Sequence, residues 1–275
     1  MKWKKSIKNL KNSFTSPKLI FYPFLLDSLA LFLTIGVGLL FSIIIQKRVN
    51  DFVGTNTPTD FQAIIASGTA EQLQALLANV KILTISLIIG LIVLTLVFLF
   101  STSLSRMLIW LKLTSQKFNR KRFWRWNLLM LVILPILLII MLLLFTLKMI
   151  ILYPFSLFIN DPMNVFWVIL SNILTMIVML ITLYIFFATN LSFVHSNLVW
   201  KSIGDAFGLL RKKIKKLPLI ILYQLVIFLV LSASVSYLLL KIFPLMPFIV
   251  TIFHVIIFLL FISWARIYFY NTVKE

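Results

Sequence analysis

Asp27 is the one acidic residue that lies well inside a long apolar stretch of this sequence. An ionisable group inside a membrane is costly, so Asp27 marks either a functional site or a buried ion pair. It lies about nine residues, or ~13 Å, from the start of its stretch, and Arg106 lies about six residues, or ~9 Å, from the end of the next one. Arg266 is a second candidate partner. We predict a structural ion pair, because a proton relay needs a chain of acids or histidines across the membrane, which this sequence lacks.

Two further polar residues within the apolar stretches are candidates for a site. No acid, cysteine or second histidine stands at helical spacing to His254, so we expect it to bind a neighbouring helix rather than a proton or a metal. Asn172 is interpreted as a contact between helices rather than as the lining of a cavity. The complete set of candidates for an intramembrane polar cluster is Asp27, Arg106, Arg266, His254 and Asn172.

Sequence motifs of known enzyme classes are absent. The chain has seven acidic residues, two histidines and no cysteine. It contains no P-loop and no GxGxxG, HExxH or GxSxG motif. We therefore predict no catalytic residue, no metal site and no cofactor.

The elements that must position these residues are long and apolar. Hydrophobic residues make up 61% of the chain and charged residues 12%, about half the charged fraction of an ordinary soluble domain. Each apolar stretch exceeds the ~20 residues that cross a membrane as a helix. We predict an all-α integral membrane protein with a single domain, a bundle of six transmembrane helices at residues 19–46, 82–111, 127–153, 164–189, 217–241 and 245–270.

The basic residues are distributed unevenly along the chain. Most of the 26 lysines and arginines lie at the two ends and in the second and fourth of the five connections between the stretches. Lysine and arginine resist translocation and accumulate on the inner side of a membrane. We therefore expect both termini inside, in the cytoplasmic membrane of a prokaryote. The net charge of +19 then needs no nucleic acid as a partner.

Three further helical segments are expected outside the membrane core. Residues 2–16 and 197–214 alternate apolar and basic positions at helical spacing, which predicts two basic amphipathic helices on the inner interface. Residues 59–80 predict an outer segment of two short helices, broken at Ser67-Gly68, the second running into the second span. Expected contacts to lipid headgroups are Trp3, Lys4, Lys8, Lys11, Arg122, Trp124, Trp126, Trp200, Lys201, Arg211 and Lys212.

Two segments carry a family resemblance. The sequence SFTSPKLIFY at 13–22 and the sequence SNLVWKSIGDAFGLLRKK at 196–213 resemble a group of six-helix prokaryotic membrane proteins. This group includes the membrane domain attached to some glycerophosphodiester phosphodiesterases. Its cytoplasmic helix often has Ala followed by Ser three residues later, whereas here Ala206 is followed by Leu209. The phosphodiesterase barrel is missing, so the resemblance implies a fold and no catalytic residue.

Three functions are compatible with these patterns. The preferred hypothesis is a non-enzymatic protein with an organisational role, such as a scaffold, a lipid-contacting protein or an accessory subunit. Its partners would be a bilayer with an anionic inner leaflet and either another protein or further copies of the chain. The alternative is a transporter or permease with a small polar cavity around Asp27 and Arg106, also lined by Asn172 and His254. The third is a lipid-modifying enzyme using His195, Asn190 and Asp205.

Overall fold

The computed structural model describes residues 17–53, 66, 69–156, 165–213, 217–242 and 247–274. Within these ranges the regular structure is entirely helical. The helices are α2 (Pro17–Val53), α4 (Ala70–Leu113), α5 (Arg120–Ser156), α6 (Val165–Ser196), α7 (Val199–Lys213), α8 (Leu217–Ile242) and α9 (Pro247–Lys274). The expected helix at 2–16 and the expected break at Ser67-Gly68 lie outside the described residues.

Six of these helices, all except α7, are long and apolar enough to cross a membrane. This is the expected number, and it indicates a multi-pass membrane protein. Lipid offers no hydrogen bonds to a backbone, so a crossing segment satisfies its own N–H and C=O groups by forming a helix. Thr84, Thr95 and Thr146 also bond the backbone carbonyl four residues earlier, which hides their hydroxyls within the helix.

Several helices extend beyond the expected spans. Helix α4 has 44 residues and contains both the range 82–111 and the later part of the expected outer segment. Helix α6 continues past residue 189 to Ser196. The next residue, Asn197, has a left-handed φ of 53°, a conformation that asparagine tolerates better than most residues. The Ser196 hydroxyl accepts a hydrogen bond from the Leu198 amide, and α7 follows directly.

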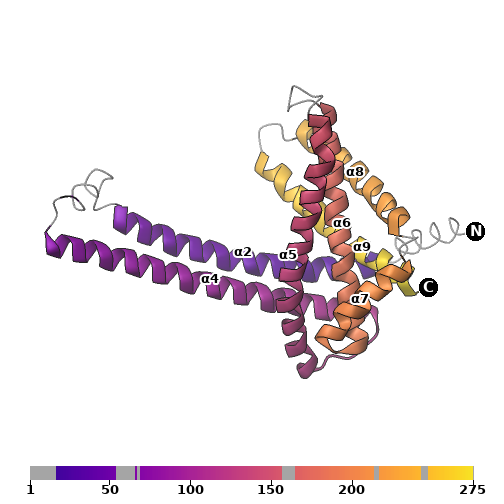
Figure 1. Ribbon diagram of the computed structural model, residues 1–275, viewed down its shortest axis with the longest axis horizontal. Helices are drawn as coiled ribbons and strands as arrows, with labels where there is room; N and C mark the ends of the chain where they lie inside the picture. The colour runs from indigo at the N-terminus through magenta and orange to yellow at the C-terminus, as the bar shows by residue number, and fades with distance from the viewer. Residues whose placement is uncertain are drawn as a thin grey trace, which may run out of the picture. The chain divides into compact units, whose positions relative to one another are not determined.

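The chain divides into two compact units, and the division falls within α2 and α4. Unit 1 comprises Met1–Ser28 and Ser103–Glu275, and unit 2 comprises Leu29–Thr102. In unit 1, α5 and α6 pack side by side, α7 packs against α6, and α8 pairs with α9 (Figure 1).

The core of unit 1 is rich in aromatic side chains. Trp110 of α4 lies edge-on to Phe187 of α6, with ring centroids 6.1 Å apart. Tyr184 of α6 contacts Phe269 of α9 at 5.2 Å. Edge-to-face pairs of this kind contribute about 0.5–1.5 kcal/mol beyond the area they bury. Aromatic contacts therefore tie together α4, α6 and α9.

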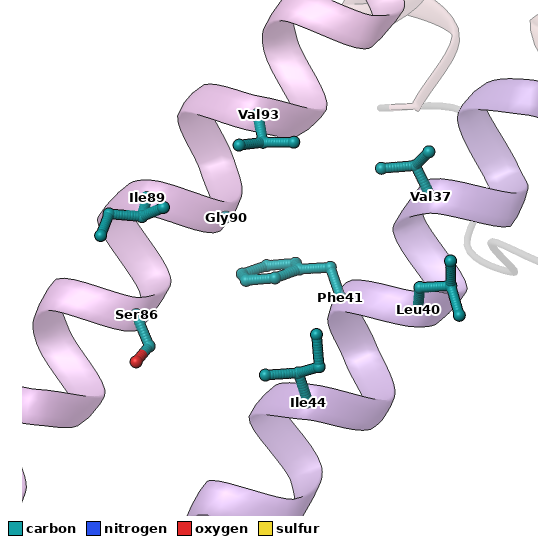
Figure 2. Close-up of a pocket in the computed structure, with 8 residues that line it drawn as sticks. All are labelled: Val37, Leu40, Phe41, Ile44, Ser86, Ile89, Gly90 and Val93. Atoms are coloured by element: carbon teal, nitrogen blue, oxygen red, sulfur yellow. The ribbon is translucent and has the colours of Figure 1, made fainter.

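Unit 2 consists of the later part of α2 and the earlier part of α4. Ala30 is the one buried residue among those whose side chains are described in this unit. The Phe41 ring of α2 points at Gly90 of α4, where the missing side chain leaves room for it (Figure 2). The two helix segments also line a groove of about 350 Å³ that is almost entirely apolar.

Candidate functional site: a buried carboxylate bound by two arginines

The structure brings Asp27, Arg106 and Arg266 together in unit 1. One carboxylate oxygen of Asp27, Oδ2, accepts hydrogen bonds from Arg106 Nη1 and Arg266 Nη2, each at 2.8 Å. The other, Oδ1, accepts a hydrogen bond of 2.7 Å from the Ser105 hydroxyl. We refer to these four residues as the ion cluster. It joins α2, α4 and α9.

The position of each helix explains the geometry. Ser105 and Arg106 are neighbours on α4, so their side chains leave the helix about 100° apart and reach the carboxylate from different directions. Arg266 approaches from α9, 239 positions away in sequence from Asp27. The side chains of Asp27 and Arg266 are 3% and 0% exposed, whereas that of Arg106 is 19% exposed. The cluster is therefore closed on the α9 side and partly open at Arg106.

Helix α6 contributes two rings to the ion cluster. The Arg106 guanidinium lies 5.5 Å from the centroid of Phe186, and the Arg266 guanidinium lies 5.4 Å from the centroid of Phe187. A cation above an aromatic face is attracted by about 0.5–2 kcal/mol, more when it is desolvated. Four helices thus share one charged centre.

The charges within the ion cluster do not cancel. Two guanidinium groups face one carboxylate, which leaves a formal excess of one positive charge. Two nitrogens of Arg266, Nε and Nη1, are buried and have no hydrogen-bond partner among the described residues. The ring of Phe187 is the contact that partly offsets this desolvation. Charge-assisted bonds of this type are strong, and removing one partner leaves a costly buried charge.

His254 and Asn172 do not join the ion cluster. His254 donates from Nδ1 to the Val250 carbonyl at 2.7 Å, and its Nε2 lies 2.9 Å from the Ser236 hydroxyl of α8. This is the expected contact to a neighbouring helix. His254 precedes Arg266 by twelve positions, or ~18 Å along α9.

Asn172 lies still further from the ion cluster. It is exposed and precedes Phe186 by fourteen positions, or ~21 Å along α6. The expected alternative, one polar cavity lined by Asp27, Arg106, Asn172 and His254, therefore has no counterpart in this arrangement. The polar residues occupy separate levels of the helices.

The expected headgroup residues other than Trp126 are found in three situations. Trp3, Lys4, Lys8 and Lys11 lie outside the described residues. The exposed ones are Trp124, Trp200, Lys201, Arg211 and Lys212, while Arg122 is half-buried. A 2.5 Å bond joins Arg122 to the Gln116 side chain.

The expected headgroup contact of Trp126 is wrong, because this residue is buried. Its side chain is 0% exposed and lies edge-on to Phe193 of α6, with centroids 4.9 Å apart. Residues two positions apart on a helix point about 200° away from each other. Trp124 and Trp126 therefore face opposite sides of α5, and only Trp124 reaches the surface.

The residues proposed for lipid modification differ in their exposure. His195 and Asp205 are exposed, whereas Asn190 is fully buried and donates to the Phe186 carbonyl at 2.7 Å. Among the described residues, no group of three or more histidine or acidic side chains is placed to hold a metal ion.

Sequence reasoning missed Ser105, which completes the ion cluster. Its position beside Arg106 in the sequence indicates the contact, because the two residues then lie at the same depth in the membrane.

Comparisons with protein-family models, with curated proteins and with solved structures gave no match to the chain.

Proposed function

We propose that this chain is a non-enzymatic protein of a prokaryotic cytoplasmic membrane with an organisational role: it contacts lipid and acts as a scaffold or as an accessory to a partner. The supporting observation is the state of Asp27. Three side chains bind its carboxylate, and it is 3% exposed. A group that carries protons or attacks a substrate must be reachable, whereas a structural ion pair needs no access from solvent or substrate.

The surface of unit 2 supports the scaffold role. Large apolar side chains of α2 and α4 are exposed around the helices; examples are Leu40 (64%), Ile43 (63%) and Leu91 (64%). Lipid tails cover such side chains at no cost, and so does another apolar helix. Unit 2 therefore offers a surface to lipid or to a second membrane protein.

In the proposed topology, both termini and α7 lie on the inner side. Helix α7 would then be a basic amphipathic interfacial helix, with Ser202 and Ala206 buried against the protein and Trp200, Lys201 and Lys212 exposed. Each lysine or arginine near an anionic leaflet contributes about 1 kcal/mol. Residues 2–16 would form the second such helix.

Introduced cysteines test this topology, because the natural chain has none. We expect a membrane-impermeant maleimide to label Lys47→Cys in intact cells and to label Lys212→Cys only after the membrane is opened. Both positions are exposed, so side-chain burial does not limit the reaction. The opposite pattern would overturn the assigned orientation.

A reconstitution assay tests the organisational role. Purified protein in vesicles is expected to show no saturable flux of ions or small solutes and no turnover of phospholipids. Saturable turnover in the natural protein that Asp27→Asn abolishes, while unfolding of the variant shows that it is folded, would contradict the proposal. It would then favour the transporter or the enzyme.

A further inference from the structure

Unit 1 also contains a groove, which lies on a different face of α2 from the ion cluster. It has a volume of about 560 Å³ and is lined by Lys18, Phe21, Tyr22 and Leu25. We refer to it as the headgroup groove. Its lining residues follow one another at spacings of three and four, so they share one face of the helix. Asp27 follows Leu25 by two positions and therefore points to the opposite face.

A second lysine, from α4, lies near one of the residues that line the headgroup groove. The Nζ atom of Lys112 lies 6.0 Å from the centroid of the Tyr22 ring. Lys18 is exposed and stands one helical turn before Tyr22. Tyr22 therefore has one lysine beside its ring and another one turn before it on its own helix.

The two lysines also lie at the same boundary of the apolar region. The membrane-crossing part of α2 starts at Lys18, and that of α4 ends at Leu113, one residue after Lys112. The phosphates of phospholipids lie at this boundary, just outside the hydrocarbon core. The groove continues from the lysines toward the apolar interior, along Tyr22 and Leu25. Its chemistry changes from cationic to apolar over about two helical turns.

We propose that the headgroup groove binds one anionic phospholipid, with its phosphate between Lys18 and Lys112 and the start of an acyl chain against Phe21, Tyr22 and Leu25. Charge complementarity favours an anionic occupant: Lys18 lines the groove, Lys112 lies near Tyr22, and no acid is found among the described residues that line it. The volume lies in the ~300–1,000 Å³ range of pockets that hold small molecules. The proposal names a specific lipid site for the lipid-contacting role above and rests on that role.

Native mass spectrometry of the full chain tests the site. The protein is purified in detergent with equal amounts of a zwitterionic and an anionic phospholipid that have the same acyl chains. We expect one anionic lipid to be retained preferentially. Each lysine near an anionic group is worth about fivefold in affinity, so the double variant Lys18→Gln/Lys112→Gln should bind it about 30-fold more weakly.

Two matched variants separate the site from general charge. Lys117→Gln/Lys121→Gln removes two exposed lysines, one in the connection that follows α4 and one in the first turn of α5, and it should retain the lipid. Lys18→Arg/Lys112→Arg keeps both charges and should also retain it. Thermal unfolding of each variant checks that the fold is intact.

The outcomes separate the possible occupants. Equal retention of both lipids, unchanged in Lys18→Gln/Lys112→Gln, would mean that acyl chains alone fill the groove and would overturn the proposal. An equal loss in the two glutamine double variants would also overturn it, because binding would then follow net charge. Turnover in the vesicle assay would contradict the proposed function without affecting the evidence for this lipid site. Lipid binding that does not depend on Lys18 and Lys112 would contradict the site without affecting the scaffold role.

Discussion

The same two helices, α2 and α4, contribute to both units but behave differently in each. In unit 1, α4 places Ser103, Ser105 and Trp110 in the interior and Arg106 at its edge. In unit 2, both helices are apolar, and Ala30 is the one buried residue among the described side chains. In a membrane, apolar side chains gain little by leaving lipid for another helix. We therefore expect charged, hydroxyl and aromatic contacts, rather than hydrophobicity alone, to stabilise the packing of these helices in unit 1.

The largest expected effect is at the ion cluster. Asp27→Asn leaves the buried guanidinium of Arg266 and the partly buried one of Arg106 without a counter-charge, and it should lower the free energy of unfolding by about 3–5 kcal/mol. Denaturant unfolding in detergent measures the change. Asp205→Asn on α7 is the control, since an exposed acid should change stability by no more than about 0.5 kcal/mol. Equal effects of the two variants would mean that the ion cluster does not hold unit 1 together.

A comparison of two tryptophans tests the aromatic core of unit 1. Trp126→Ala removes a fully buried indole beside Phe193 and should cost about 3–5 kcal/mol. Trp124→Ala removes an indole that is 54% exposed, and should change the unfolding free energy by about 0.5 kcal/mol or less. If Trp124→Ala lowered the unfolding free energy more than Trp126→Ala did, then Trp124 and not Trp126 would face the interior of the protein, which would contradict this packing of α5.

The hydrogen bond between α8 and α9 should have a smaller effect. Hydrogen bonds between membrane helices contribute about 0.6 kcal/mol on average. Removing Ser236 and His254 singly and together, as Ser236→Ala and His254→Phe, gives their coupling from the unfolding free energies. A coupling of about 0.5–1.5 kcal/mol is expected. A value near zero would mean that the 2.9 Å contact does not stabilise the pair.

The smallest effect is expected in unit 2. A methyl group added by Gly90→Ala would overlap the Phe41 ring, and the ring can swing aside because it is the end of a flexible side chain. The lost contact is offset by the better helix propensity of alanine, about 1 kcal/mol. The net change should stay within about 1 kcal/mol. A loss of unfolding free energy as large as that expected for Asp27→Asn would show that α2 and α4 are tightly packed in unit 2.

The number of apolar helices could be predicted because length and hydropathy are local properties of the chain. The pairing of Asp27 with Arg106 could be predicted from depth, which is also read along the sequence. The rotation of a helix about its axis is set by its neighbours and could not be read in this way. For this reason the sequence predicts a surface position for Trp126, which is buried, and does not single out Ser105.

The grouping of polar residues was harder to predict than their contacts. His254 bonds α8 as expected, yet it and Asn172 lie ~18–21 Å along their helices from the level of the ion cluster. Polar residues scattered through apolar helices join neighbouring helices locally, and composition does not distinguish such contacts from the lining of a cavity.

A double-mutant cycle on Asp27 and Arg266 tests the central claim most directly. Unfolding free energies are measured for the natural protein, Asp27→Asn, Arg266→Gln and the double variant. If the ion cluster is a structural link between α2 and α9, the coupling should be at least about 2 kcal/mol, and the double variant should be more stable than Asp27→Asn. If the two single losses of unfolding free energy sum to the loss of the double variant within about 0.5 kcal/mol, a structural link is contradicted. Asp27 would then again be a candidate functional residue.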